Sequence, residues 1–506
     1  MNLHLTLVPL LAAPALAQSW DVQPLALAGD VVPGVGSQTF AYELAIHDAL
    51  DWRVVVDTDG PFSANAALIG PAGVIQAEAW PVSAPAGATT KSFQSLSINA
   101  HGQTATIQTL YGTSSTADDS AVYLDGQLLV REGDLTGAPG YPAGTTYHTL
   151  YEVKVDDAGD VLLLAGMDDP SNPGLPDHAL IRLGTSAAGT LASEAAVWVE
   201  GSLVPASGGD LQGLLTDSDS FDLGDAGDVI AVLDTDLPTT GDDMVVLNGA
   251  ILAWQGAASP VAGRSWSTLL GAEVTVNNAG GHAYDGVLDG DASTNQVIVK
   301  DGLVFAQKGA PTPGLPASLL EGFGHGPLDL ADTGELLWYG TFGGATSNQD
   351  EALFLDDVPI VREGVTTVGG VVVDVLYGST NGYAISDDGR FVIFQAILKD
   401  NTSGIFLAMR PAAAVTVPGC GAFEGSLSVS SGAPAQGTSM QLTYDHPLLL
   451  TGARQLGVSG VSWVDSSGCG VVVPVVVGAH IEAELGDRAT AQWLADQLTD
   501  ESAVIR

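Results

Sequence analysis

The chain has 506 residues, 46% of them apolar and 6% aromatic, with 63 glycines against only 15 lysines and arginines. Its 59 acidic residues give a formal net charge of −44, which repels nucleic-acid phosphates and anionic lipid headgroups, so we expect no nucleic-acid partner. The length and the apolar fraction suffice for a sizeable buried core and argue against a disordered chain.

The N-terminus has the pattern of a secretory signal peptide over residues 1–17. An apolar run from Leu5 to Leu16 overlaps the small-x-small cleavage motif Ala15-Leu16-Ala17. No later segment reaches the roughly 20 apolar residues that a membrane-spanning helix needs. We therefore expect a mature chain without a membrane span that is secreted, or placed at the cell surface or in the periplasm.

One motif recurs after the signal peptide: an apolar strand, a polar turn that ends in glycine, and a second apolar strand. A tight hairpin requires a positive φ at this place, which glycine adopts without steric cost. Successive turns are 52 to 68 residues apart, and the first copy has leucine where the others have glycine. The seven turn positions are Leu50, Gly102, Gly159, Gly227, Gly280, Gly334 and Gly389.

A second hairpin lies between successive copies, and Asp-Gly or Asn-Gly at its turn is a strong hairpin signal. Each repeat therefore holds four strands, which we letter A to D in chain order. Arg-Glu occurs on two D strands, at Arg131-Glu132 and Arg362-Glu363, where we interpret the charges as protection of the outer edge from pairing. The clear second hairpins span Ala121–Asp134, Ala196–Asp210, Met244–Gly256, Val297–Gly309 and Ala352–Gly364.

Four antiparallel strands in a repeat of this length are typical of a β-propeller blade. The last repeat ends on a third strand, Ile405–Arg410, whereas Pro24–Gly34 matches a fourth strand that has no first three. Joining the two completes a blade and leaves no open edge. We predict an all-β fold over residues 18–410: a propeller of about seven four-stranded blades, closed by the N-terminal strand.

The turn Ser386-Asp387-Asp388-Gly389-Arg390-Phe391 resembles the blade turns of exported bacterial β-propellers in the broad TolB-like and kelch-like group. The resemblance covers residues 24–410 and implies the architecture without implying an activity. The turn departs from the sialidase Asp-box, Ser-x-Asp-x-Gly, because its glycine comes one residue early.

The C-terminal part differs from the repeats. Residues 411–418, rich in alanine, valine and proline, predict a linker, and residues 419–506 predict a small β-domain with a short helix-like tail over 487–506. Cys420 and Cys469 are the only cysteines, and an exported protein favours their pairing in one disulfide. This part resembles the short cysteine- and glycine-rich modules that end many exported bacterial repeat proteins.

The connections between strands B and C are long and rich in Asp, Ser, Thr and Asn, which predicts one acidic loop face shared with the D–A connections. Clustered carboxylates favour Ca²⁺, which takes six to eight oxygen ligands. Aspartate is also common in turns because its side chain binds nearby backbone N–H groups. The candidate calcium ligands are Asp57, Asp59, Asp168, Asp169, Asp234, Asp236, Asp289 and Asp291.

Motifs that would indicate a catalytic site, such as HExxH and Gly-x-Ser-x-Gly, do not occur in the sequence. We therefore expect a monomeric, non-catalytic binding or scaffold propeller, associated with calcium, whose ligand is an extracellular glycan or protein on the acidic face. The alternative is an extracellular polysaccharide hydrolase or lyase with its site at the channel mouth, where paired carboxylates would act as acid and base.

Overall fold

The computed structural model of the chain describes residues 20–171, 177–214, 220–224, 226–324, 326–344, 349–378 and 381–410, together with six strands between residues 427 and 482. The chain divides into two compact units, residues 1–410 and 411–506. The predicted signal peptide, the linker, Cys420, Cys469 and the C-terminal tail lie outside the described residues. No helix in the described part of the chain is long and apolar enough to cross a membrane.

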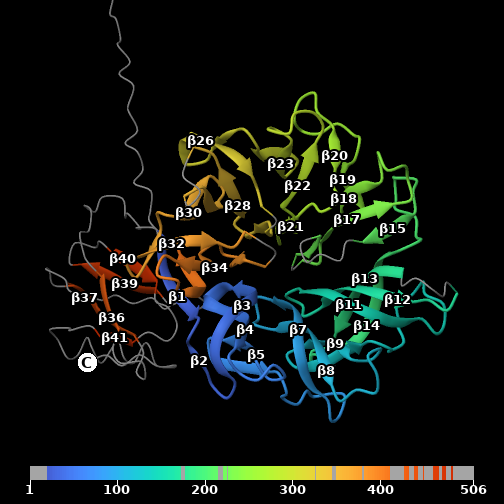
Figure 1. Cartoon of the computed structure of the whole chain (residues 1–506), viewed down its shortest axis with the longest axis horizontal. Coiled ribbons are helices and arrows are strands. Elements are labelled where there is room, and N and C mark those ends of the chain that lie inside the picture. The colour runs from blue at the N-terminus through green and yellow to red at the C-terminus, as the bar shows by residue number, and fades with distance from the viewer. Residues whose placement is uncertain are drawn as a thin grey trace, which may run out of the picture. The chain divides into compact units, whose positions relative to one another are not determined.

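The first unit confirms the predicted fold: a propeller whose seven sheets follow one another around a ring (Figure 1). Blade 1 contains β2 (Val31–Val32), β3 (Gly36–His47), the 3₁₀ turn η1 (Asp48–Leu50), β4 (Asp51–Thr58), β5 (Ala66–Gly70) and β6 (Gly73–Ala77). Blade 2 contains β7 (Thr89–Ile98), β8 (Thr104–Tyr111), β9 (Ser120–Leu124) and β10 (Gln127–Arg131). Blade 3 contains β11 (Thr146–Val155), β12 (Val161–Asp168), β13 (Asp177–Thr185) and β14 (Leu191–Val199).

In blades 4 to 7 strand A is split into two pieces that both pair with strand B. Blade 4 contains β15 (Leu211–Leu214), β16 (Phe221–Leu223), β17 (Val229–Thr235), β18 (Asp243–Leu247) and β19 (Ala250–Trp254). Blade 5 contains β20 (Trp266–Thr268), β21 (Val274–Val276), β22 (His282–Leu288), β23 (Gln296–Lys300) and β24 (Leu303–Gln307). Blade 6 contains β25 (Pro311–Thr312), β26 (Leu315–Gly322), β27 (Asp329–Leu330), β28 (Leu336–Phe342), β29 (Glu351–Leu355) and β30 (Val358–Arg362). Blade 7 contains β31 (Thr367–Val368), β32 (Val371–Leu376), β33 (Tyr383–Ile385), β34 (Phe391–Leu398), β35 (Ser403–Met409) and the N-terminal β1 (Asp21–Leu27).

The ring closes as predicted, because β1 pairs antiparallel with β35. The register runs from Asp21 opposite Met409 to Leu27 opposite Gly404, and it shifts once between Pro24 and Ala26. The two ends of the propeller chain therefore share one sheet, and blade 7 takes its outermost strand from the N-terminus. This pairing removes the edge that an open array of blades would expose.

The turn residues adopt the backbone conformations that the sequence predicts. All six turn glycines after strand A have a positive φ, for example 74° at Gly102 and 85° at Gly334. Leu50, in the first copy, adopts the same left-handed region with a φ of 61°. In the C–D hairpins of blades 2, 4 and 5 the residue before glycine is left-handed too, and its side chain accepts a strand-B N–H, as Asp125 does from Thr104. In blade 3 the C–D hairpin joins β13 to β14 over residues 186–190, so the hairpin predicted at Ala196–Asp210 is wrong, because this segment begins within strand D.

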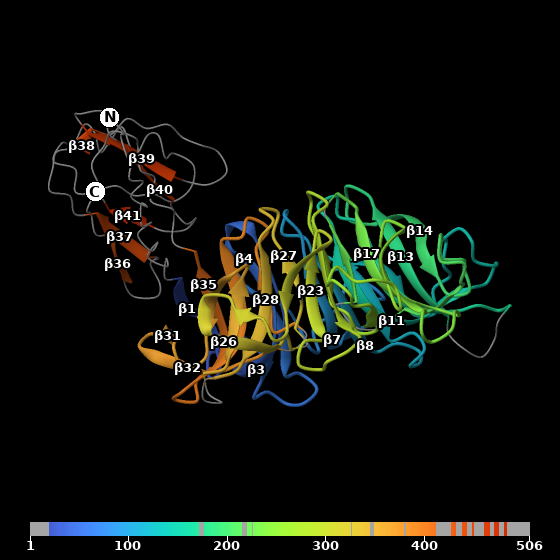
Figure 2. The same ribbon diagram turned by 90° about the horizontal axis from the view of Figure 1, so that it is seen from above.

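The core consists of apolar layers between neighbouring blades. Strand β12 shows the principle, since Val161, Leu162, Leu163 and Leu164 are all fully buried. Val161 and Leu163 pack with blade 2, whereas Leu162 and Leu164 pack with blade 4. Both faces of a strand B are therefore covered, which explains its continuous apolar sequence. Figure 2 shows the blades edge-on, with strands such as β4 and β17 running between the two faces of the propeller.

The Arg-Glu dipeptides of the D strands have a different role from the one we predicted. Glu132 is only 7% exposed, and its carboxylate accepts the N–H of Ser120, the first residue of the same blade's strand C, at 3.1 Å. Glu78 accepts the N–H groups of Asn65 and Ala66 in the same way. The interpretation of Glu132 and Glu363 as exposed edge charges is wrong, because both side chains are buried and that of Glu132 binds the start of strand C.

The second unit contains two small sheets among its described residues. In one, β37 (Thr438–Leu442) pairs antiparallel with β36 (Leu427–Ser431) and parallel with β41 (His480–Glu482). In the other, β39 (Gly460–Asp465) pairs antiparallel with β38 (Leu448–Leu449) and β40 (Gly470–Pro474). This unit is thus built from strands where it is described.

Candidate functional site

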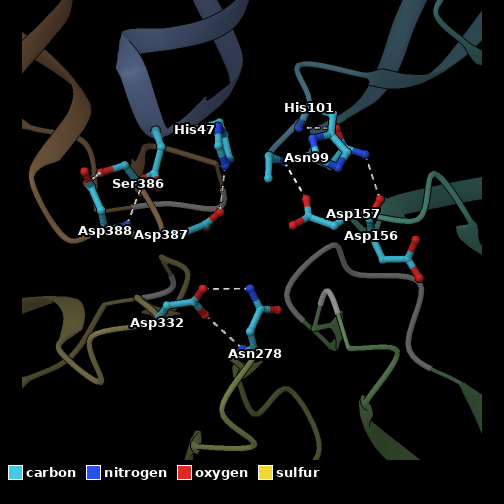
Figure 3. Close-up of polar contacts among 12 residues, drawn as sticks. His47, Asn99, His101, Asp156, Asp157, Asn278, Asp332, Ser386, Asp387 and Asp388 are labelled. Carbon is cyan, nitrogen blue, oxygen red and sulfur yellow. Dashed lines mark hydrogen bonds and ion pairs between the residues drawn. The ribbon is translucent and has the colours of Figure 1, made fainter. Parts of the chain in front are cut away.

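A central channel runs between the innermost strands of the seven blades. Its cavity has a volume of about 180 Å³ and is lined by residues of every strand A, from Leu44 on β3 to Ala384 on β33. The polar lining gathers where strand A turns into strand B. Figure 3 shows this end of the channel, with the turn residues of several blades facing one another.

Hydrogen bonds join the A–B turns of neighbouring blades around this end of the channel. Asp157 accepts the N–H of Ala100 from the blade before it at 2.7 Å. Asp332 receives two hydrogen bonds from Asn278, one from the backbone N–H at 3.0 Å and one from the side-chain amide at 2.7 Å (Figure 3). At the closure, Asp48 accepts the N–H of Asp388 at 2.8 Å. The aspartates of these turns therefore bind the blades to one another.

A second set of such bonds lies deeper in the channel. A side chain on strand A of one blade accepts a backbone N–H from strand A of the next blade. Asp222 accepts from Val276 at 3.0 Å, and Asp329 accepts from Ile385 at 2.8 Å. Burial, with the nearby charges of Asp222 and Asp387, raises the pKa of Asp329 to about 7. The channel carboxylates thus have structural partners, and one of them is held partly protonated near neutral pH.

His47 and two aspartates form a separate group at the junction between blades 7 and 1. The imidazole Nε2 of His47 lies 3.0 Å from a carboxylate oxygen of Asp387. The ligand atoms of His47, Asp48 and Asp387 all lie within 4.8 Å of one another. Burial lowers the pKa of His47, but Asp387 outweighs it and raises the pKa above its usual value. Burial, together with Asp388 and Asp387, raises the pKa of Asp48 to about 6.

Three of the eight predicted calcium ligands have equivalent structural positions on the B–C connections. Asp59 accepts the N–H of Ser37 at 2.7 Å, Asp236 that of Asp210 at 2.8 Å, and Asp289 that of Ser265 at 3.1 Å. In each case the carboxylate holds the start of strand A in its own blade. These contacts are the backbone-capping role that aspartate commonly has in turns.

Two more of the predicted ligands bind their own loops. Asp169 accepts the N–H and hydroxyl of Ser171, both at 2.7 Å, and Asp291 accepts the same two groups of Ser293 at 2.9 Å. These hydrogen bonds lower the pKa of Asp291. Asp168 is exposed at the end of β12, and burial raises the pKa of Asp57 at the end of β4.

Asp234 is the predicted ligand that the structure places in a carboxylate cluster. Its carboxylate oxygen and those of Asp242 and Asp243 lie within 4.8 Å of one another, on the B–C connection of blade 4. Burial raises the pKa of Asp234, and the charges of Asp242 and Asp243 raise it further. One oxygen of Asp243 accepts the hydroxyl of Thr268 at 2.8 Å and the N–H groups of Leu269 and Leu270, all in blade 5.

Among the described residues, this cluster and the His47 group are the two sets of three or more metal-binding side chains close enough to share an ion. The Asp-x-Asp pattern found Asp234 but missed Asp242 and Asp243, which stand together at the end of the same connection. It also missed His47, Asp48 and Asp387. In the sequence these three residues are recognisable only as members of A–B turns, and such turns predict short hairpins rather than a metal site.

No protein-family model matches the chain, and no curated protein matches it either. Among solved structures it is similar to the Dos1 propeller (11% identity, TM-score 0.33, covering 75% of this chain and 81% of that one). It is also similar to the polysaccharide lyase Uly1 (10%, 0.34, 75% and 91%) and to a gluconolactonase from Xanthomonas campestris (11%, 0.26, 79% and 99%). TM-scores of this size carry no argument about chemistry, and the fold assignment rests on the strand pairing.

Proposed function

We propose that this chain is an exported, non-catalytic binding propeller that holds Ca²⁺ at Asp234, Asp242 and Asp243. Its ligand, an extracellular glycan or protein, binds on the face formed by the B–C and D–A connections. We further propose that it belongs with the exported bacterial propellers of the TolB-like and kelch-like group, which its blade turns resemble.

The observation that carries the proposal is the convergence of three carboxylates in blade 4. Burial, and then the like charges of Asp242 and Asp243, destabilise the ionised state of Asp234 and raise its pKa. A divalent cation with oxygen ligands removes that cost, and Ca²⁺ accepts carboxylates with flexible geometry. Asp243 also binds three groups of blade 5, so an ion at this cluster would rigidify the junction of two blades on the loop face.

The carboxylates of the central channel support the non-catalytic part of the proposal, because they have structural partners. Asp222 and Asp329 already accept backbone N–H groups of the next blade, which accounts for carboxylates in the channel wall without a substrate. The B–C face has an exposed carboxylate at Asp168, available to a ligand or to the ions that accompany it.

The test is the melting temperature of the mature protein in EDTA, in millimolar Ca²⁺ and in millimolar Mg²⁺. An ion at about one hundred times its Kd stabilises the folded state by about 2.7 kcal/mol. We expect Ca²⁺ to raise the melting temperature by several degrees and Mg²⁺ to raise it much less. Asp242→Asn should remove most of the Ca²⁺ effect, and Asp168→Asn, an exposed aspartate outside the cluster, should leave it intact.

An equal response of the wild type and Asp242→Asn to Ca²⁺ would contradict the assignment of the ion to this cluster. Release of unsaturated products or new reducing ends from polysaccharides by the purified protein would contradict the non-catalytic role and favour a lyase or hydrolase. A glycan array and pull-down with exported proteins, each with and without Ca²⁺, then identify the ligand class.

A further inference from the structure

The A–B end of the channel contains a junction between the first and last blades of the ring. Blades 7 and 1 meet there, joining parts of the chain that are about 340 residues apart in sequence. His47 ends strand A of blade 1, Asp48 begins the following turn, and Asp387 lies in the equivalent turn of blade 7. The pairing of β1 with β35 completes blade 7 and closes the ring between these two blades.

At the equivalent place in blades 2 and 5 an amide joins the turn to the next blade. Asn99 donates to the carbonyl of Asp156 at 2.7 Å, and Asn277 donates to the carbonyl of Ala331 at 2.9 Å. His47 stands where these asparagines stand, but it approaches a carboxylate of the preceding blade instead. At the junction of blades 7 and 1 the residue of blade 7 at this place is Ser386, whose hydroxyl donates to Asp388 of its own turn. An imidazole and two carboxylates therefore meet where those two junctions have an amide and a carbonyl.

The geometry of His47 indicates an incomplete set of partners. The residue is only 7% exposed, and its Nε2 atom is buried without a well-formed hydrogen bond. Asp387 lies 3.0 Å away, close enough for an ion pair but outside the direction in which Nε2 would bond. One oxygen of Asp48 is held by the N–H of Asp388 at 2.8 Å, which orients its carboxylate. Figure 3 shows His47 and Asp387 directed toward each other across the junction.

We propose that His47, Asp48 and Asp387 bind Zn²⁺ and that the ion fastens the closure of the ring. Zinc is bound by His nitrogen at about 2.0–2.1 Å and by carboxylate oxygen at about 2.0–2.2 Å, so its ligand atoms lie roughly 3.3 Å from one another in a tetrahedron. The 3.0 Å separation of Nε2 and the Asp387 oxygen fits that spacing. Ca²⁺ fits poorly here, because it takes six to eight oxygen ligands and the set includes a nitrogen.

Such an ion would link residues of the first and last blades. Because the ligands meet only in the closed ring, Zn²⁺ binds the closed form selectively and stabilises it. The three protein ligands leave a fourth position for water, which the open end of the channel supplies. This site is distinct from the carboxylate cluster of blade 4, which has only oxygen ligands.

The test is isothermal titration of the EDTA-treated mature protein with Zn²⁺, with Co²⁺ absorption spectra as a second readout. The wild type should bind one equivalent at this site and give Co²⁺ bands typical of a tetrahedral site with a nitrogen ligand. His47→Gln and Asp387→Asn should each weaken this binding by about tenfold or more. Asp332→Asn is the matched control, since it removes a carboxylate at the same end of the channel but outside the group.

Equal Zn²⁺ affinity of the wild type and His47→Gln would overturn the proposal, as would a loss of binding in Asp332→Asn as large as that in His47→Gln. If His47→Gln does not fold, Asp387→Asn and the Co²⁺ spectrum of the wild type decide the question. Asp242→Asn separates this proposal from that of the calcium site, because it should lose the Ca²⁺ response and keep the Zn²⁺ affinity.

Discussion

Replacing Glu132 with glutamine should stabilise the propeller at pH 8. Glu132 is buried beside Asp119, and Asp119 lies 3.6 Å from the ammonium group of Lys91. Burial, and then the charge of Asp119, raises the pKa of Glu132 from 4.5 to about 7. A proton on Glu132 lets this side chain share a hydrogen bond with Asp119. Above pH 7 Glu132 ionises, and the folded state bears the repulsion between the two side chains.

The magnitude follows from the two pKa values. A group whose pKa is higher in the folded state stabilises the fold at low pH, and that contribution is lost as pH rises from about 4.5 to about 7. Moving the pKa from 4.5 to about 7 corresponds to about 3 kcal/mol. The amide of Glu132→Gln still accepts the N–H of Ser120 and can donate to Asp119. We therefore expect a gain of up to about 3 kcal/mol at pH 8 and a much smaller gain at pH 5.

The assay is urea unfolding at pH 5 and pH 8, followed by tryptophan fluorescence. Glu335→Gln is the control with the opposite sign, because Arg410 donates to both oxygens of Glu335, at 2.8 and 2.6 Å. Burial raises the pKa of Glu335, but Arg410 outweighs burial and the pKa is lowered. Glu335→Gln should therefore destabilise the protein at pH 8 and less so at low pH. A loss of stability in Glu132→Gln at pH 8 would refute the reasoning.

Two further substitutions test the closure and the channel. Gly404→Ala places a Cβ against the carbonyl oxygen of Ala26 on β1, so it should lower the free energy of unfolding by about 1–3 kcal/mol and speed amide exchange in β1. Gly213→Ala is the control: its Cβ would meet no atom within 4 Å, and the stability should not change. Asn99→Ala removes a buried side chain that donates to the carbonyl of Asp156 and accepts two N–H groups of its own turn. The free energy of unfolding in urea should fall by roughly 2–3 kcal/mol, because three hydrogen bonds are lost. One hydrogen bond contributes a net value of roughly 0.5 kcal/mol at least, so a smaller loss than that would contradict the role of these bonds.

The sequence by itself determined the blades, because hairpin chemistry is local. A residue with positive φ at the end of each A–B turn, and an aspartate or asparagine before glycine in the C–D turns of blades 2, 4 and 5, specify these hairpins within a few residues. The C–D hairpin of blade 3, residues 186–190, lacks that pair, and its predicted position at Ala196–Asp210 is wrong. The unpaired third strand near Ile405 and the unpaired fourth strand at Pro24 predicted the closure, since strand edges must find partners. Even Leu50, which breaks the glycine pattern, takes the left-handed conformation that its place requires.

Only the tertiary structure decided which side chains meet. The Asp-x-Asp pattern selected aspartates one by one, and the fold then gave Asp59 and Asp289 a backbone N–H while placing Asp234 beside Asp242 and Asp243. The fold also brought His47 to Asp387, although about 340 residues separate their turns. The register between neighbouring blades depends on how apolar layers pack around the whole ring. No short stretch of sequence contains that information, so the blades were predictable and the sites between them were not.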